Sequence, residues 1–273
     1  IRIYSHQWLL FNFGACGVRA WPQPNSLLNP SSSSFSTLDI SSFISSDGKY
    51  FGGVLGPDGL IYFIPFNADN VGILNPSSSS FSTLDISSFI SSSGKYRGGV
   101  LGPNGLIYFI PFNADHIGIL NPSSNSFSTL DISSFISSDG KYNGGVLGPN
   151  GLIYFIPSNA DHIGILNVSS SSFSTLDISS FISSSGQKFH GGVLGPNGLI
   201  YFIPHNANHI GILNPSSNSF STLDISSFIS SYYKYAGGVL GPNGLIYFIP
   251  YVANHIGILN PSSSSFSTLD ISS

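Results

Sequence analysis

The chain has 273 residues, of which 41% are hydrophobic, and this is enough to bury a sizeable core. Only 7% of the residues are charged, against about 25% in an ordinary soluble domain, and the formal net charge is −4. These values exclude a chain that is disordered throughout. They also leave no basic surface for a polyanion, so we expect no nucleic-acid partner.

Residues 1–25 form an atypical N-terminal segment that does not share the pattern of the rest of the chain. It has an arginine followed by an apolar run and small residues, which is loosely similar to a signal peptide with a poor cleavage end. The single cysteine, Cys16, cannot form an internal disulfide. Apolar runs such as LIYFIPF are far shorter than the roughly 20 residues of a membrane-spanning helix, so we expect no membrane insertion.

Residues 26–273 consist of near-identical repeats. The turn sequence GPNG or GPDG begins at Gly56, Gly102, Gly148, Gly195 and Gly241, in steps of 46, 46, 47 and 46 residues. Within one unit, turn residues separate four segments rich in β-branched and aromatic residues, which we predict to be strands at 98–103, 106–111, 116–120 and 126–133. No apolar pattern recurs every 3.6 residues, so no helix is predicted.

Four short strands in about 46 residues are typical of a propeller blade, so we predict an all-β fold, a β-propeller of four-stranded antiparallel blades. The continuous run LIYFI fits a strand covered on both faces by neighbouring blades. Paired glycines such as Gly98 and Gly99 fit an innermost strand that is crowded at the axis. Five complete units run from residue 52, and residues 26–51 repeat only the last two strands.

The number of blades depends on residues 1–25. If they supply the first two strands of blade 1, the chain forms six blades, and this is the count we expect. The alternative is a ring of five blades with a surplus outer strand. Such a strand would present a free edge, and free edges pair with other chains.

The phrase GGVLGPNGLIYFIPFNADHIGILNP, with its glycines, Pro-Asn-Gly turn, tyrosine and following asparagine, resembles the repeat of NHL-type and gluconolactonase-like β-propellers. The resemblance covers roughly half of each unit and implies the propeller fold. For a gluconolactonase-like enzyme it would also imply a metal on the axis with a glutamate among its ligands. This chain contains no glutamate. No catalytic residue is therefore carried over, and we expect no cofactor and no enzyme activity.

Two sets of titratable residues recur at equivalent positions. Four histidines follow an NAD, NAN or VAN turn: His116, His162, His209 and His255. They could bind a metal, but equivalent positions on neighbouring blades lie too far apart for Zn–ligand bonds of about 2 Å. A hairpin turn is favoured instead, in which Asn and Asp bond their own backbone and His packs against the next blade. Six aspartates end the STLD segment: Asp39, Asp85, Asp131, Asp177, Asp224 and Asp270. Because they recur in every copy, we interpret them as structural groups that bond the backbone at a strand end.

The copies differ mainly at two positions. Before the glycine pair stand Phe51, Arg97, Asn143, His190 and Ala236. After Ile-Pro stand Phe66, Phe112, Ser158, His205 and Tyr251. The first strand begins and the second ends at the same end of a blade, so we expect both sets on one face, where loops on a rigid scaffold carry recognition. The alternative explanation is drift at exposed positions that nothing constrains.

These observations predict a secreted, non-catalytic propeller that recognises a glycan or a peptide through this face, because exposed aromatic residues suit both. The alternative is a structural protein that assembles with copies of itself into extracellular filaments through strand edges or blade contacts. A metal-dependent lactonase-like enzyme ranks third because glutamate is missing. Low charge, serine-rich turns and one glycosylation sequon at Asn167 favour an extracellular location.

Overall fold

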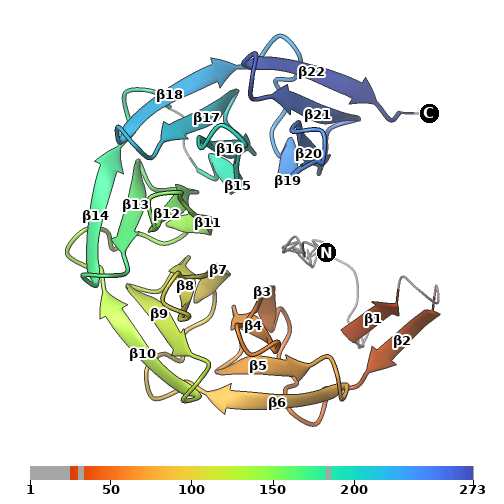
Figure 1. Ribbon diagram of the computed structural model, residues 1–273, viewed down its shortest axis with the longest axis vertical. Coiled ribbons are helices and arrows are strands. Elements are labelled where there is room, and N and C mark those ends of the chain that lie inside the picture. Colours follow the sequence, from red (N-terminus) through yellow and green to blue (C-terminus); the bar gives the residue numbers. More distant parts are fainter. Residues whose placement is uncertain (1–24, 30–33, 183–185, 273) are drawn as a thin grey trace, which may run out of the picture.

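The computed structural model describes residues 25–29, 34–182 and 186–272. In these ranges the regular secondary structure consists of strands, without a helix. Five four-stranded antiparallel sheets follow one another around a common axis, and a two-stranded sheet precedes them (Figure 1). The predicted all-β propeller of four-stranded blades is therefore confirmed. Since these ranges hold no helix, none in them is long and apolar enough to cross a membrane.

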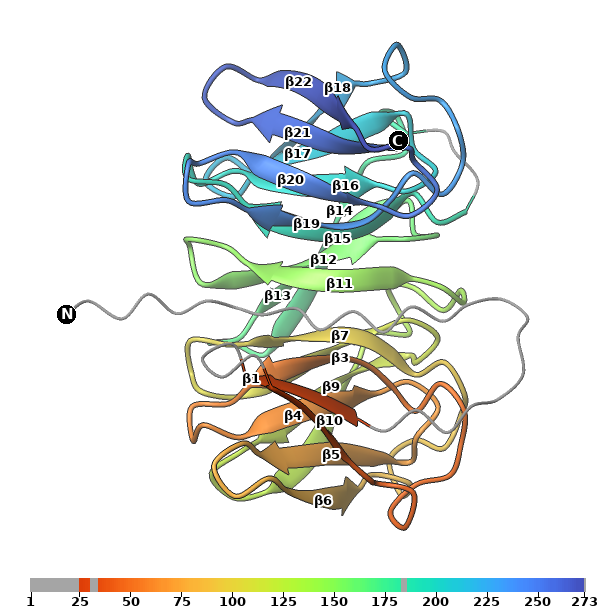
Figure 2. The same cartoon turned by 90° about the vertical axis from the view of Figure 1, so that its right-hand side faces the viewer.

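Each blade runs from its innermost to its outermost strand in chain order. The first blade contains β3 (Tyr50–Leu55), β4 (Ile61–Pro65), β5 (Asn70–Asn75) and β6 (Ser80–Asp85). The second contains β7 (Tyr96–Leu101), β8 (Ile107–Pro111), β9 (His116–Asn121) and β10 (Ser126–Asp131). The third contains β11 (Tyr142–Leu147), β12 (Leu152–Pro157), β13 (His162–Asn167) and β14 (Ser172–Asp177). The fourth contains β15 (Phe189–Leu194), β16 (Ile200–Pro204), β17 (His209–Asn214) and β18 (Ser219–Asp224). The fifth contains β19 (Tyr235–Leu240), β20 (Ile246–Pro250), β21 (His255–Asn260) and β22 (Ser265–Asp270). The innermost strands of successive blades contact one another along the axis (Figure 2).

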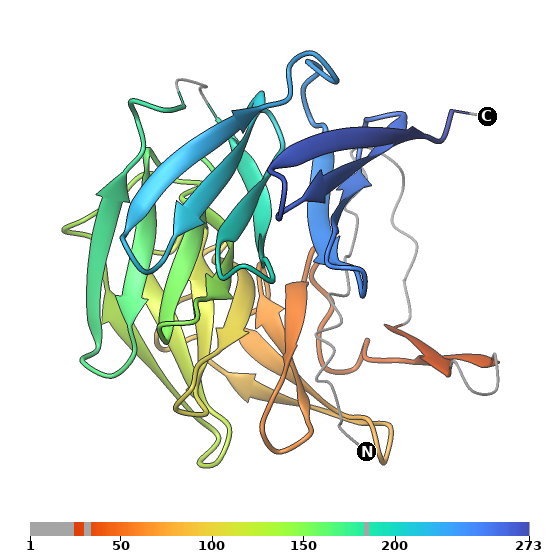
Figure 3. The same cartoon turned by 45° about the horizontal axis from the view of Figure 1, so that its top comes forward.

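The described strands leave the ring open between the fifth and first blades, which lie on the two sides of this opening in Figure 3. At the opening lies the two-stranded sheet of β1 (Asn25–Asn29) and β2 (Ser34–Leu38), which correspond to the last two strands of a blade (Figure 1). Two further strands would complete a sixth blade there. The expectation that residues 1–25 supply them falls outside the described ranges, apart from Asn25, which begins β1.

The fifth blade exposes apolar side chains that other blades bury. Val239 is 52% exposed, whereas Val100 at the equivalent position is 5% exposed. Ile271 is 46% exposed, whereas Ile225 is completely buried. In the earlier blades the following blade covers these positions, so the fifth blade presents a face built for contact with another sheet.

A β-bulge interrupts the first strand of every blade. In β11 the pairing with β12 shifts between Tyr142 and Gly145, so this strand carries one residue more than its partner. Within the bulge, Gly144 has a φ of +84°, in the left-handed region that glycine occupies without steric cost. A bulge changes the direction of the side chain beside it. The variable residue that precedes the glycine pair therefore leaves the regular alternation of the strand.

In the second to fifth blades, the second glycine of the pair is required by the packing of blades. A Cβ on Gly145 would lie 2.8 Å from Cδ1 of Ile110 and 3.1 Å from Cγ2 of Val100, both on the preceding blade. Protein interiors are close-packed, so a larger residue there would force the blades apart. We expected crowding at the axis to explain both glycines of the pair. In the structure the first glycine allows the bulge, and the second leaves room for the preceding blade.

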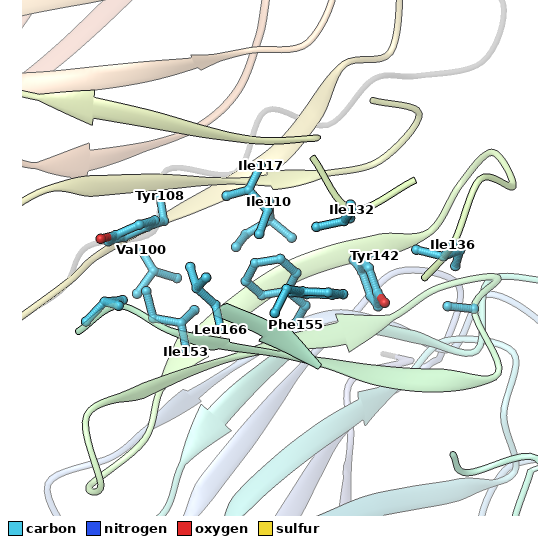
Figure 4. Close-up of a cluster of buried hydrophobic side chains, with 13 residues drawn as sticks. Val100, Tyr108, Ile110, Ile117, Ile132, Ile136, Tyr142, Ile153, Phe155 and Leu166 are labelled. Carbon is cyan, nitrogen blue, oxygen red and sulfur yellow. The ribbon is translucent and has the colours of Figure 1, made fainter. Parts of the chain in front are cut away.

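The hydrophobic core lies between the blades. One cluster joins Val100 and Ile110 of the second blade to Phe155 and Leu166 of the third (Figure 4). Equivalent clusters join the other successive blades. As predicted for the run LIYFI, β8 is buried along its whole length because sheets cover both its faces.

Side-chain hydrogen bonds fix the turns. In the GPNG turn, Asn104 Nδ2 donates to the hydroxyl of Tyr108 at 2.8 Å. At the end of β10, Asp131 Oδ1 accepts the backbone N–H of Ser133 at 2.8 Å. The same contact follows the fourth strand in every copy. The structural role predicted for the STLD aspartates is confirmed by these bonds.

A polar clasp, formed by the NAD turn of one blade and the Gly-Lys pair of the next, links successive blades. Asn113 Oδ1 accepts the N–H of Gly140 at 3.0 Å. Lys141 Nζ donates to the carbonyl of Asn113 at 3.1 Å and forms an ion pair with Asp115 at 3.0 Å. The asparagine and aspartate side chains, which we expected to bond their own backbone, thus bond the neighbouring blade here.

The clasp loses its acid towards the end of the chain. Between the fourth and fifth blades, Asn208 stands where earlier blades have aspartate, and Lys234 Nζ donates to the carbonyl of Asn206 at 3.2 Å. No carboxylate of the described residues lies within ion-pairing distance of Lys234. Burial lowers the pKa of Lys234 to about 8. In the fifth blade, Val252 and Asn254 replace both the asparagine and the aspartate of the clasp.

Candidate functional site

A cavity lies on the propeller axis, and the first strands of all five blades line it. Its walls are the glycine pairs and four of the variable residues before them: Phe51, Arg97, Asn143 and His190. The cavity volume is about 100 Å³, which is room for several water-sized groups. Because glycines leave the backbone bare, these four side chains supply the cavity with its chemical character.

Aromatic rings hold Arg97 in place at this cavity. Its Cζ lies 3.7 Å from the ring centroid of Phe112 and 5.1 and 5.2 Å from those of Phe51 and Phe66. The negative faces of these rings attract the guanidinium. Burial lowers the pKa of Arg97 to about 10, so the side chain remains cationic at neutral pH.

Arg97 has no matching anion in the part of the chain that the structure describes. Its Nε is buried and has no hydrogen-bond partner there. The ion pairs of the described residues are those of Lys95, Lys141 and Lys188, and none includes Arg97. Arg97 is partly buried as a whole, and even a partly buried cation without an anion is costly, so this arrangement is unusual for a purely structural group.

Two histidines form the opposite wall of the site. His190 and His205 stack with ring centroids 5.3 Å apart, and His190 meets Phe51 across the axis at 6.2 Å. His190 Nδ1 lies 2.6 Å from the carbonyl oxygen of Ala236, and His205 Nδ1 lies 2.8 Å from that of Tyr235. A carbonyl only accepts, so each Nδ1 carries a proton and each Nε2 of the neutral ring is an acceptor.

Both imidazoles are neutral at pH 7. Burial is the main cause that lowers the pKa of His190, to about 4, and the nearby charge of Arg97 acts in the same direction. Burial likewise lowers the pKa of His205. Among the described residues, the cavity lining therefore carries one formal charge, the positive charge of Arg97.

Tyr233 extends this aromatic group outwards. Its ring lies 5.2 Å from that of His205 and 6.5 Å from that of Tyr251. Its φ is 56°, at a position where three other copies have glycine. A tyrosine in the left-handed region costs about 1–2 kcal/mol, so the contact is made against the local backbone preference. Tyr233 was not among the predicted site residues. The replacement of a glycine found in three other copies is the sequence signal that distinguishes this position.

The structure brings most of the two variable sets together. Four residues of the first set line the cavity, all but Ala236, and Phe66, Phe112 and His205 of the second pack against them. Tyr251 reaches the site through His205, with ring centroids 5.8 Å apart. Ser158 is completely buried, and its Oγ has no hydrogen-bond partner among the described residues. The two sets therefore form two layers around one cavity.

Several of these residues are buried, although both sets were expected at exposed positions. Asn143 is 4% exposed, His205 5% and Ser158 0%. Of the second set, only Tyr251 is a large exposed side chain. The bulge and the blade interfaces turn the other residues inwards. Drift at unconstrained surface positions therefore does not explain why these buried positions differ between copies.

The repeated histidines do not line the cavity. His116 begins β9, and its ring packs edge-on against Tyr96 of its own blade at 6.2 Å. Burial lowers its pKa. Within the described ranges, no three side chains of His, Cys, Asp or Glu gather closely enough to hold a metal ion.

The fold and the site define a β-propeller of four-stranded blades with an asymmetric axial cavity, to which four of the five blades contribute a different side chain. Virginiamycin B lyase from Staphylococcus aureus is similar, with a TM-score of 0.74 and 19% identity over 90% of this chain and 76% of its own. Streptogramin B lyase has a TM-score of 0.67 and 21% identity, over 85% of this chain and 71% of its own. The extracellular domain of the hybrid two-component system BT4673 from B. thetaiotaomicron has a TM-score of 0.67 and 12% identity, over 89% of this chain and 32% of its own.

At these identities the likeness shows the fold alone, and at that level it supports the resemblance to propeller repeats. No family model matches the sequence, and no curated protein matches it either. Two of the similar structures are lyases by name. The expectation that this chain is not an enzyme therefore stays a prediction.

Proposed function

We propose that the protein is a recognition module that binds a glycan or a peptide at the axial cavity. The observation that carries this proposal is that positions which differ between otherwise identical blades converge on one cavity, and several of them are buried there. Buried positions in near-identical repeats are under the same packing constraints, so differences among them need another cause. A ligand that is itself asymmetric supplies one.

The side chains at the site favour binding over catalysis. None of the described residues that line the cavity has a carboxylate. The Nδ1 protons of His190 and His205 are held by backbone carbonyls, and both rings are neutral at pH 7. The arrangement thus provides hydrogen-bonding, aromatic and cationic contacts without an acid and base pair facing each other.

Glycan and peptide arrays probed with the native protein test the proposal. Hits are then measured by isothermal titration calorimetry on the native protein and on Phe112→Ser, which introduces the residue that the third blade has at this position. We expect at least about tenfold weaker binding by Phe112→Ser, because the ring that holds Arg97 is lost. Phe135→Ser on the outer rim, where Phe135 is exposed, is the matched control and should bind normally. A native protein without any hit on either array would contradict the proposal.

Self-assembly is the second candidate function, and the exposed apolar face of the fifth blade supports it. Val239, Leu269 and Ile271 are each about half exposed there. Paired with a blade of another copy, this face would join molecules end to end. Analytical ultracentrifugation and negative-stain microscopy test this function, with Leu269→Ser plus Ile271→Ser as the variant. Filaments that the double variant loses support it, and a monomer at every concentration contradicts it.

We place the protein outside the cell. Its low charge and serine-rich turns support this location, as does a fold shared with an extracellular domain. The sequon residue Asn167 ends β13 and is partly exposed, with its Oδ1 accepting the N–H of Ser169 at 3.0 Å. The mass of protein from its source, measured before and after treatment with a peptide N-glycosidase, checks the glycan at Asn167. No mass difference would remove this support.

A further inference from the structure

The positive charge of Arg97 makes the cavity selective for the sign of the charge on its ligand. The buried lysines Lys95, Lys141 and Lys188 are each paired with an aspartate at 2.9–3.0 Å. Arg97 is instead surrounded by the faces of three phenylalanines. Ring faces attract the guanidinium but cannot accept hydrogen bonds as oxygen does, and the buried Nε–H has no acceptor in the described residues. A ligand oxygen at this place would complete its hydrogen bonding.

Other charged groups do not cancel this selectivity. Asn143 and His190, which share the cavity lining with Arg97, are neutral at pH 7. Lys234 also has no carboxylate within ion-pairing distance among the described residues, but it is completely buried and does not line the cavity. One positive charge in an apolar cavity is balanced best by one negative charge.

The shape of the guanidinium narrows the choice of anion. Its planar fork matches a carboxylate, which it binds through two parallel hydrogen bonds. A doubly charged phosphate would leave an excess negative charge in this apolar cavity, and a neutral sugar would leave the cation unpaired. Around the anion, the ring of Phe51 and the Cα groups of the glycines offer apolar contact, while Asn143 and His190 are the neutral polar side chains of the lining. Tyr233 and Tyr251 add aromatic surface beyond them.

We propose that the ligand presents a single carboxylate on an apolar body to Arg97, as the C-terminus of an apolar peptide or a small organic acid does. This inference rests on the proposed function and names the chemistry that the site selects. The carboxylate accepts hydrogen bonds from the guanidinium, and the apolar body lies against Phe51 and the glycine backbone.

Pairs of probes that differ only in charge test the proposal on the full chain by isothermal titration calorimetry. N-acetyl-L-phenylalanine and its amide represent the peptide C-terminus, and phenylacetate and phenylacetamide represent a small organic acid. Glucuronate and glucose represent a sugar with and without the same charge. We expect at least one of the two apolar acids to bind about tenfold or more tightly than its amide, and the pair that does so identifies the source of the carboxylate.

The repeats supply variants that the fold already accepts. Arg97→Ala and Arg97→Asn introduce the residues that the fifth and third blades have at this position. In both variants the affinity for the acid should fall to about that for its amide, so that their ratio is about one. Arg97→Lys keeps the positive charge without the planar guanidinium and should retain part of the preference for the acid. Phe135→Ser on the outer rim is the control and should retain all of it. Two independent replacements keep the test decisive if one of them fails to fold.

The outcomes separate this inference from the proposed function. If the amides bind as tightly as the acids, or if acid binding survives in Arg97→Ala and Arg97→Asn, the carboxylate proposal is wrong and binding at the cavity stands. If glucuronate binds with the same dependence on Arg97 while both apolar acids do not, the apolar body is wrong. If no probe binds but the arrays give hits, the inference fails alone. If neither probes nor arrays give binding, both fail.

Discussion

His190→Asn is expected to make the stability of the protein less dependent on pH. Asparagine occupies the equivalent position in the third blade, so the change keeps a polar side chain that the fold accepts there. The His190 imidazole has its pKa lowered from 6.5 to about 4 in the folded protein. An unfolded chain therefore binds a proton at this residue between these pH values, and the folded chain does not. The neutral His190 ring therefore makes its full contribution to the free energy of unfolding above about pH 7, and this contribution is lost as the pH falls from 6.5 towards 4.

The size of the effect follows from the two pKa values. With 6.5 in the unfolded state and about 4 in the folded state, the loss between pH 7.5 and pH 5 is about 2 kcal/mol. The STLD aspartates have lowered pKa values because backbone N–H groups bond them, and they add their own loss at lower pH. Measurements at pH 5 and above avoid most of the stability loss caused by these aspartates. What remains is the same in the native protein and in His190→Asn, so it cancels when the two are compared.

Urea unfolding followed by circular dichroism at pH 7.5 and pH 5 measures this difference. The native protein should lose about 2 kcal/mol more than His190→Asn over this interval. An NMR titration of the His190 ring gives its pKa directly. An equal loss in both proteins, or a folded-state pKa near 6.5, would refute the reasoning that burial keeps this ring neutral.

Three further predictions concern the clasp, the strained tyrosine and the blade interface. Asn208→Asp restores the acid that Lys234 lacks and should raise the free energy of unfolding by about 0.5–1 kcal/mol in a chemical denaturation at pH 7; an unchanged value would show that solvent screens the new pair. Tyr233→Gly removes left-handed strain at the expense of a ring contact and should change stability by less than about 1 kcal/mol, while a larger loss would show that the contact with His205 outweighs the strain. Gly145→Ala places a Cβ 2.8 Å from Ile110 and should cost about 1–3 kcal/mol, seen as a lower Tm; an unchanged Tm would contradict the close packing of the blades.

Much of the fold is predictable from the sequence because each blade repeats the same local instructions. The GPNG turns, the apolar run of the second strand and the STLD aspartates act within one copy, over a few residues. Asp131, for example, bonds a backbone group only two residues away. Such contacts leave a recognisable pattern, and the periodic repetition of that pattern indicates the propeller.

The contacts between blades are harder to predict, because identical copies do not say which copy is the partner. The side chain of Asn113 bonds Gly140, 27 residues further on. The blade of Asn113 has an equivalent glycine, Gly94, and the sequence alone does not say which of the two is the partner. The burial of Asn143 and Ser158 depends on the bulge and on the neighbouring blades together. The pairing of His190 with His205 likewise needs the three-dimensional arrangement, since the sequence shows only two unrelated departures from the repeat.

The β-bulge at the start of every first strand places the packing of the blades and the variation between copies on different residues. The glycines that follow the variable residue carry the backbone turn and the blade contact, so that residue is left free of both. The cavity can therefore be regarded as a modular surface with one interchangeable side chain per blade. Exchanging these side chains between blades, or randomising them together, would rewrite the specificity of the cavity while the scaffold stays the same. A library built this way would turn the repeat into a general platform for small-ligand binders.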